Sequence, residues 1–210
     1  MIVIIDYGMG NLVSVLKAFR RLNIPAKISS DVHDIRQAEK LILPGVGHFK
    51  SGMQRLHELK LVDALNKKVL DEGAPILGIC LGMQLFSRFS EEGDAEGLGW
   101  IDAKTVRFIL DRDHRNLRVP HMGWNTIKPS SENAALKNIG SDALFYFVHS
   151  YHVVCENPAD VLAASEYGIP FVSAIQKENI YGVQFHPEKS HDNGLKLLKN
   201  FVELPFHVKA

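Results

Sequence analysis

The stretch APILGICLGMQ, residues 74–84, decides how this chain folds. Its first part, Ala74–Ile79, is a short apolar run bounded by turn residues, which is typical of a buried strand. Cys80 follows the run and stands between Gly78 and Gly82. A helix is expected directly afterwards, so the pattern is that of a nucleophile elbow with Cys in place of Ser.

An elbow of this kind has physical requirements that the sequence meets. The turn is so tight that the positions on either side of the nucleophile must be nearly free of side chain. The nucleophile then projects above the sheet at a helix N-terminus, where the helix dipole and free N–H groups favour a thiolate. The alternative is a buried structural cysteine between two packing glycines, and the pentapeptide by itself favours neither interpretation.

The first half of the chain alternates short apolar runs with longer helical patterns. Asn11 is a suitable N-cap for a helix whose apolar residues, from Leu12 to Leu22, recur at helical spacing. Strands alternating with helices predict a parallel sheet covered on both faces. The other strands predicted here are Ile2–Ile5, Ala26–Ser29 and Leu41–Leu43, and the other helical segments are Phe49–Leu70, with a break near 57–60, and Met83–Phe89.

The second half has strand patterns with short connections, some of them expected to be antiparallel, and a final helix at Asn193–Phe201. We therefore predict one α/β domain over residues 1–210, with an open, mostly parallel, flavodoxin-like sheet, helices on both faces and some antiparallel strands in the C-terminal half. Sites in such sheets lie at the carboxyl ends of the strands. The predicted strands are Thr105–Phe108, Phe145–Val148, Val153–Cys155, Val161–Ser165, Phe171–Gln176 and Ile180–Phe185.

A second candidate for chemistry is His186-Pro187-Glu188, at the end of the last predicted strand. A His and a Glu two apart in extended chain point to the same side, and Glu188 could also hold the His186 ring from a neighbouring turn. A general base needs such a partner to fix its tautomer. Taken alone, an ordinary polar turn explains the three residues better.

The segment Pro44-Gly45-Val46-Gly47 follows another predicted strand. Its glycines would let backbone N–H groups turn toward a ligand, as an acyl-transfer site requires for the developing oxyanion. The candidate donors are the N–H groups of Leu81, Val46 and Gly47. In isolation a plain Pro-Gly turn is the simpler explanation. A nucleophile, a base with its orienting group and an oxyanion loop, each at a strand end, are nevertheless an improbable combination by chance.

Composition excludes several classes of function. The 210 residues carry 24 Lys plus Arg and 24 Asp plus Glu, so no global charge attracts nucleic acid or membrane. The N-terminus lacks a basic segment before its apolar run, and no stretch is apolar enough to span a membrane. The two cysteines are therefore expected to be free thiols in a cytoplasmic protein.

No metal or cofactor is expected. His149 and His152 could suggest a metal pair, but a strand-like segment would put them on opposite faces. Gly8-Met9-Gly10 follows the first strand, as in a dinucleotide-binding loop, but Val13 occupies the position of the third glycine.

Two motifs, GICLGMQ (78–84) and QFHPEKS (184–190), resemble the signature of the class I, or triad, glutamine amidotransferases. Within this family, four further blocks are similar to the glutaminase subunit of imidazole glycerol phosphate synthase, an enzyme of histidine biosynthesis. These blocks are DYGMGNLVSV (6–15), LPGVGHF (43–49), VPHMGWN (119–125) and YFVHSYH (146–152).

The resemblance implies a role for each matching position. Cys80 would attack the amide carbon of glutamine, His186 would relay protons, and Glu188 would orient His186. The remaining positions hold the substrate or face a partner. Those implied to bind substrate are Gly47, Gln84, Glu92, Ser150 and Tyr151, and those implied to face the partner are Asn11, Trp124, Tyr146 and Lys189.

The resemblance also implies a heterodimer with a (β/α)₈-barrel cyclase, which receives ammonia through an internal channel and whose bound nucleotide activates the glutaminase. We expect the isolated chain to hydrolyse glutamine very slowly, because the 44–47 loop rests with its N–H groups turned away. Three alternatives stay open: the glutaminase subunit of another synthase, a cysteine peptidase or deglycase-like hydrolase, and a catalytically inactive binding protein.

Overall fold

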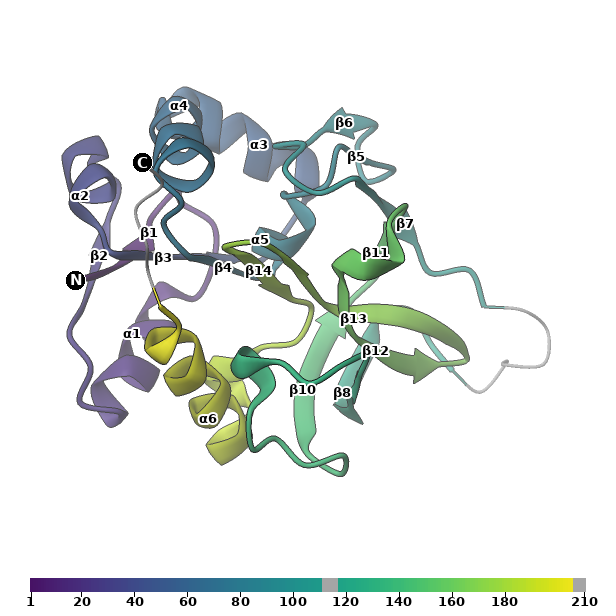
Figure 1. Cartoon of the computed structure of the whole chain (residues 1–210). Coiled ribbons are helices and arrows are strands. Elements are labelled where there is room, and N and C mark those ends of the chain that lie inside the picture. Colours follow the sequence, from purple (N-terminus) through teal and green to yellow (C-terminus); the bar gives the residue numbers. More distant parts are fainter. Residues whose placement is uncertain (111–116, 206–210) are drawn as a thin grey trace.

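The computed structural model describes residues 1–110 and 117–205, and a long sheet runs through its centre with helices on both faces (Figure 1). The parallel half of this sheet has the order β2-β1-β3-β4-β14. These strands are β1 (Ile2–Ile5), β2 (Ala26–Ser29), β3 (Lys40–Gly45), β4 (Ile76–Cys80) and β14 (Ile180–Val183).

Antiparallel pairing begins where β14 meets β13 and continues through β11 to β7. A separate antiparallel pair, β8 with β10, lies next to this extension. The fold class predicted from the sequence is thus confirmed. The strands are β5 (Phe89–Ser90), β6 (Ala95–Glu96), β7 (Ala103–Arg107), β8 (His121–Thr126), β9 (Lys128–Pro129), β10 (Leu144–His149), β11 (Tyr151–Cys155), β12 (Val161–Tyr167) and β13 (Ile169–Lys177).

The helices divide between the two faces of the sheet (Figure 1), with α1 and α6 on one face and α2, α3 and α4 on the other. Strand β1 shows why its sequence is a continuous apolar run: Ile2 and Ile4 pack in the core on one face, and Val3 and Ile5 in the core on the other. The helices are α1 (Leu12–Arg21), α2 (Val32–Gln37), α3 (Phe49–Glu58), α4 (Leu61–Asn66), α5 (Leu81–Gln84) and α6 (His191–Glu203).

The helix predicted at Met83–Phe89 is wrong. Helix α5 begins at Leu81 and ends after one turn at Gln84. The carbonyl groups of residues 85–88 accept hydrogen bonds from the N–H groups of residues 97, 98, 99 and 101 instead of continuing the helix. Tertiary pairing with a distant segment has overridden the local helical pattern.

Other element boundaries also differ from prediction. Strand β14 ends at Val183 rather than at residue 185, because the backbone N–H of His186 bonds to the carbonyl of Tyr146 at 2.9 Å and draws the chain out of the sheet. Helix α2 and strand β8 were not predicted, whereas Asn11 caps α1 as expected, its side chain accepting from the N–H of Ser14.

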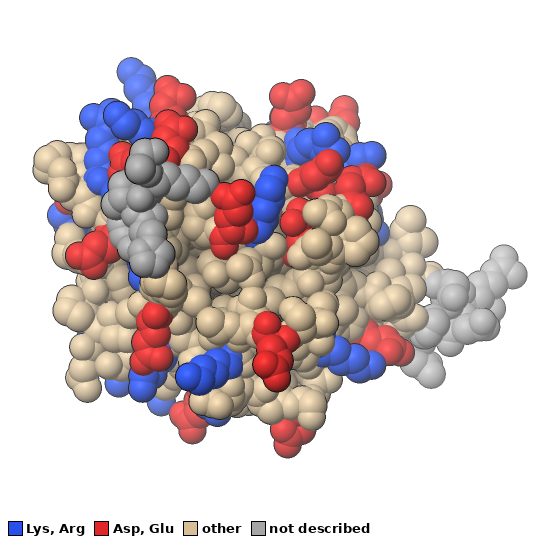
Figure 2. Space-filling view, in the orientation of Figure 1, with Lys and Arg blue, Asp and Glu red and all other residues tan. Residues whose placement is uncertain are grey.

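The charged surface agrees with the balanced composition. Figure 2 shows acidic and basic side chains intermixed on the face it displays. No helix in the described residues is both long enough and apolar enough to cross a membrane.

Candidate active site

Cys80 is the last residue of β4, and its backbone is strained. Its φ of 55° and ψ of −109° lie in a region that non-glycine residues rarely adopt. The flanking glycines are required: a Cβ on Gly82 would lie 1.8 Å from the carbonyl oxygen of Leu43, and one on Gly78 would lie 2.6 Å from the ring of Phe86. This is the tight strand–turn–helix elbow predicted from the sequence.

The elbow differs from expectation in one respect. Helix α5 has four residues, so few peptide dipoles are aligned behind the sulfur. The helix dipole is therefore a smaller source of thiolate stabilisation than the sequence suggested.

His186 and Glu188 form a buried pair. The Nδ1 atom of His186 lies 2.8 Å from Oε1 of Glu188, and the two side chains are 2% and 3% exposed. The short 3₁₀ turn Pro187–Lys189 brings the carboxylate back to the ring. Of the two geometries considered from the sequence, the turn rather than the extended strand is the one present.

Cys80 and His186 interact across the junction of β4 and β14. Burial opposes a charge on the imidazole, but its interactions with Cys80 and Glu188 outweigh burial and raise the pKa of His186 to about 10. The Nε2 atom nevertheless has no hydrogen bond of standard geometry to a described residue. The pair is thus held close, with a cationic imidazole favoured at neutral pH, and tightening this contact would give proton-transfer geometry.

The pocket beside Cys80 has a volume of about 290 Å³, at the lower end of the range for small-molecule sites. It contains Cys80 itself, all three candidate oxyanion residues and all five positions implied to bind substrate. His186 and Glu188 are not among the residues that line it, and His186 reaches the pocket through its interaction with Cys80. The residues that line it are Val46, Gly47, Cys80, Leu81, Gln84, Glu92, Pro120, Val148, His149, Ser150 and Tyr151.

The polar side chains of the pocket are already held by the protein. Oε2 of Glu92 accepts a hydrogen bond from the N–H of Phe49 at 2.7 Å, at the start of α3. Nε2 of Gln84 donates to the carbonyl of Tyr151 at 3.1 Å. Gly47 has a φ of 108°, in the region that favours glycine. The pocket is therefore largely formed without a ligand.

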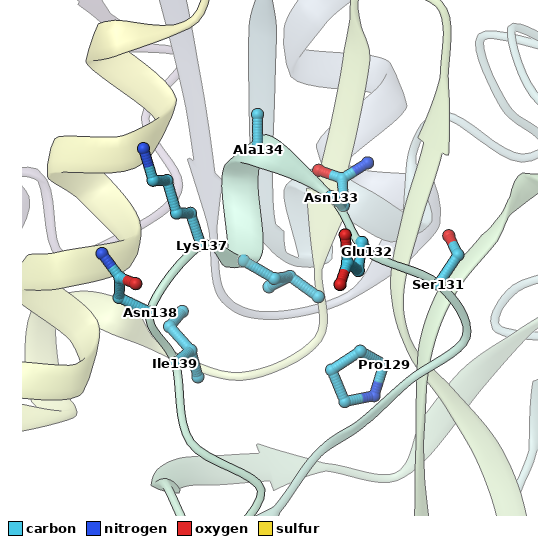
Figure 3. Close-up of a pocket in the computed structure, with 9 residues that line it drawn as sticks. Pro129, Ser131, Glu132, Asn133, Ala134, Lys137, Asn138 and Ile139 are labelled. Carbon is cyan, nitrogen blue, oxygen red and sulfur yellow. The ribbon is translucent and has the colours of Figure 1, made fainter.

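A wider hollow of about 670 Å³ lies elsewhere, along the loop that carries residues 129–139 (Figure 3). Its polar lining includes Glu132, Asn133 and Lys137, and it contains none of the residues singled out from the sequence. Size alone does not select the candidate site, because the smaller pocket is the one that holds Cys80 and the positions singled out from the sequence.

Comparisons with known proteins agree with this geometry. The family model for glutamine amidotransferase class-I matches residues 3–204. This chain belongs to the class-I glutamine amidotransferase family. Solved structures with the same fold include a glutamine amidotransferase (TM-score 0.71, 20% identity, 96% of this chain and 97% of that chain) and PurLQS from Thermotoga maritima (TM-score 0.71, 14% identity, 96% of each chain).

Two curated relatives are more similar in sequence. Imidazole glycerol phosphate synthase subunit HisH 2 of Methanococcus maripaludis is 53% identical over 97% of this chain and 99% of the relative. The protein of the same name from Pseudomonas aeruginosa is 52% identical over 97% of this chain and 100% of the relative.

In this amidotransferase, three of the four residues implied to face a partner form one exposed cluster. Trp124, 46% exposed, stacks on His191 with ring centroids 5.1 Å apart and also meets the edge of Tyr146 at 5.8 Å. Nζ of Lys189 lies 5.6 Å above the Tyr146 ring. We call Trp124, Tyr146, Lys189 and His191 the aromatic cluster. Asn11 lies apart, although the helix it caps packs against the turn 187–189.

The expectation that His149 and His152 lie on opposite faces of a strand is wrong. They belong to different strands, β10 and β11, and both rings pack against Phe108, at 5.2 and 4.6 Å between centroids. The Nδ1 of His149 donates to the carbonyl of Tyr151, and its Nε2 accepts from Nδ1 of His121 at 3.1 Å. Burial lowers the pKa of His149 to about 3, so this chain of hydrogen bonds is neutral.

The sequence did not single out two buried polar residues beside Cys80, Gln184 and Tyr7. Gln184 is fully buried, and its Nε2 lies 3.6 Å from Sγ of Cys80. The signal that could have found it is a glutamine at the end of an otherwise apolar strand. The Tyr7 hydroxyl packs against Gly45, where an added Cβ would lie 2.3 Å from it, and it has no hydrogen-bond partner among the described residues.

Replacing Tyr7 with Phe is expected to stabilise the protein by about 1 kcal/mol, because a buried hydroxyl without a partner keeps the full cost of its desolvation. Burial, followed by the charge of Cys80, raises the pKa of Tyr7, so the hydroxyl stays neutral. Urea unfolding measures the change. Tyr167→Phe is the matched control and should destabilise, because its hydroxyl donates to the carbonyl of Arg118 at 2.9 Å. A destabilised Tyr7→Phe variant would contradict this reasoning.

Proposed function

We propose that this chain is the glutaminase subunit of an imidazole glycerol phosphate synthase and acts as a single domain over residues 1–210. It would hydrolyse glutamine to glutamate and ammonia through a thioester on Cys80. The observation that carries the proposal is a strained cysteine in a pocket of amino-acid size, which interacts with a buried His–Glu pair. The names of the two HisH relatives support the choice of synthase.

Each member of the triad has a distinct role in this reaction. The Cys80 thiolate attacks the amide carbon, and the imidazolium of His186 gives a proton to the leaving nitrogen, which departs as ammonia. The neutral His186 then takes a proton from the water that hydrolyses the thioester, releasing glutamate and the thiolate. Glu188 fixes the tautomer of His186 and stabilises its positive charge, as its 2.8 Å contact with Nδ1 supports.

The other pocket residues would bind the rest of the substrate. We assign oxyanion stabilisation to the N–H groups of Leu81 and of Val46 or Gly47, since these residues flank Cys80 in the pocket wall. Binding of the amino-acid end of glutamine is assigned to Gly47, Gln84, Glu92, Ser150 and Tyr151, which line the same pocket. The free carboxylate oxygen of Glu92 would face the substrate ammonium.

The partner would be a (β/α)₈-barrel cyclase that receives the ammonia. The aromatic cluster is a suitable docking surface, because Trp and Tyr are typical anchors of protein interfaces, and here an exposed Trp124 lies beside a half-buried Tyr146. Backbone hydrogen bonds also connect the aromatic cluster to His186. Tyr146 accepts a backbone hydrogen bond from His186, and the backbone N–H of Lys189 donates to the carbonyl of the same histidine. A partner that moved this surface would therefore move the base.

The proposal includes no cofactor and no nucleic-acid partner. Positive and negative charges are equal in number, which gives no field that would attract a polyanion. A cytoplasmic location is part of the proposal, since Cys80 and Cys155 are both free thiols.

Ammonia release from glutamine, measured with the chain alone and with the cyclase and its nucleotide substrate, tests this function. The chain alone is expected to be slow, and the complete system faster by about 10²–10³-fold, the contribution of one oxyanion donor that becomes available on activation. Trp124→Ala should weaken cyclase binding and activation, whereas exposed Val154→Ala, remote from the cluster, should not. Rapid turnover by the isolated chain would contradict the gating, and no ammonia from the complete system would contradict the function.

A further inference from the structure

Gln184 lies beside the nucleophile because of strand register. Strands β14 and β4 are parallel, with Val183 paired to Ile79, so the residues that follow, Gln184 and Cys80, leave the sheet next to each other. Gln184 is 0% exposed. A buried amide requires hydrogen-bond partners, so its contacts are informative.

The orientation of this amide is fixed by its neighbours. Nε2 of Gln84 has two protons and donates one to the Tyr151 carbonyl at 3.1 Å and the other to Oε1 of Gln184 at 3.0 Å. Turning the Gln184 amide over would set two N–H groups against each other, so Oε1 faces Gln84. Nε2 of Gln184 therefore faces the Cys80 sulfur, at 3.6 Å.

The sulfur has different partners in its two ionisation states. The thiol proton can reach the carbonyl of Val148, 3.9 Å away, but a thiolate can only accept hydrogen bonds. The Gln184 N–H is a donor already aimed at it. Since α5 is only one turn long, this side-chain donor supplies stabilisation that the short helix dipole does not.

We propose that Gln184 is a further catalytic residue, whose side-chain N–H binds the Cys80 sulfur and stabilises its anionic form. This inference rests on the proposed glutaminase function and deepens it. The donor acts before attack, when the thiolate is the nucleophile. It acts again when the tetrahedral intermediate of thioester hydrolysis collapses: the C–S bond breaks, and its electron pair returns to sulfur beside the same N–H.

Gln184→Met tests the proposal because methionine has a similar size and lacks the donor. The rate of Cys80 alkylation by iodoacetamide is measured as a function of pH, and the midpoint of this profile should move upward by about one to two pH units. A shift of this size corresponds to the free energy of a hydrogen bond to a charged group. In the complex with cyclase and nucleotide, kcat should fall about 10-fold or more while KM for glutamine changes little. Gln176→Met, in the same sheet but bonded to Tyr181, is the matched control.

Gln184→Asn is the second variant, since it keeps an amide but withdraws it from the sulfur, and it should give the same direction of shift. Circular dichroism establishes that each variant is folded. An unchanged alkylation midpoint in either folded variant would overturn the proposal. Alkylation needs no glutamine and no cyclase, so a shift without glutaminase activity would retain the role of Gln184 and refute only the proposed reaction.

Discussion

Cys80→Ala is expected to abolish glutamine hydrolysis, with kcat falling by roughly 10⁵–10⁶-fold, as when the nucleophile of a triad is removed. No other described residue is placed to form the thioester, because Cys155 lies in β11 outside the pocket, and burial raises its pKa to about 12. The measurement is ammonia release by the chain in complex with cyclase and nucleotide. Cys155→Ala, the matched control, should retain activity.

The same variant has an expected effect on His186. In the folded protein the pKa of His186 is raised from the ordinary 6.5 to about 10, and Cys80 is one of the groups that raise it. The stabilisation from this protonated imidazole is fully present below about pH 6.5 and is lost as the pH rises through about 10. In Cys80→Ala only Glu188 opposes the effect of burial, so the pKa of His186 should fall. The contribution of protonated His186 to the folding stability should then be lost at a lower pH than in the parent protein.

An NMR titration of the His186 ring in both proteins measures this shift directly. Equal His186 pKa values in the two proteins would mean that the sulfur and the imidazole do not interact, and the assignment of His186 as the base would then lose its electrostatic support. Retained hydrolysis by Cys80→Ala would remove Cys80 from the reaction altogether.

The parallel half of the sheet could be predicted because each of its strands is buried on both faces. Such strands are continuous apolar runs, as in β1 and β4. They can be recognised from the local sequence without knowing which strands pair with them. The short helix α5 could not be predicted in the same way. Its end is set by hydrogen bonds from residues 97, 98, 99 and 101, which no local pattern reveals.

The residues of the candidate site likewise fall into those that local sequence identifies and those that depend on tertiary structure. Cys80 and Gly82 are identified by local requirements of the elbow, and His186 and Glu188 by their short spacing. A glutamine at the end of an apolar strand marks Gln184 as unusual, but its position beside Cys80 depends on the register between two strands that are about a hundred residues apart. The aromatic cluster also depends on tertiary structure, since β8, β10, the turn 187–189 and the start of α6 bring its members together.

Gly82→Ala is expected to have the largest effect on folding. An added Cβ would lie 1.8 Å from the backbone oxygen of Leu43 and 2.8 Å from its carbonyl carbon, and a backbone group in the middle of the sheet cannot rotate away as a side chain can. Strand β3 and helix α5 would have to separate, which loses packing on both. Overpacking a core typically costs about 1–3 kcal/mol and occasionally more, and this contact should exceed that range. Urea unfolding and the yield of soluble protein measure it.

Gly52→Ala is the matched control, because it adds the same methyl group within α3 and against the same helix. Its Cβ would lie 3.3 Å or more from the tips of Leu85 and Leu81, which can yield, and alanine favours a helix over glycine by about 1 kcal/mol. Its stability should stay within about 1 kcal/mol of the parent. If Gly82→Ala were equally stable, β3 and α5 could not approach as closely as the structure has them. The tight turn that brings Cys80 to the pocket wall would then need another cause, because the strain at Cys80 is maintained only while these two elements stay in contact.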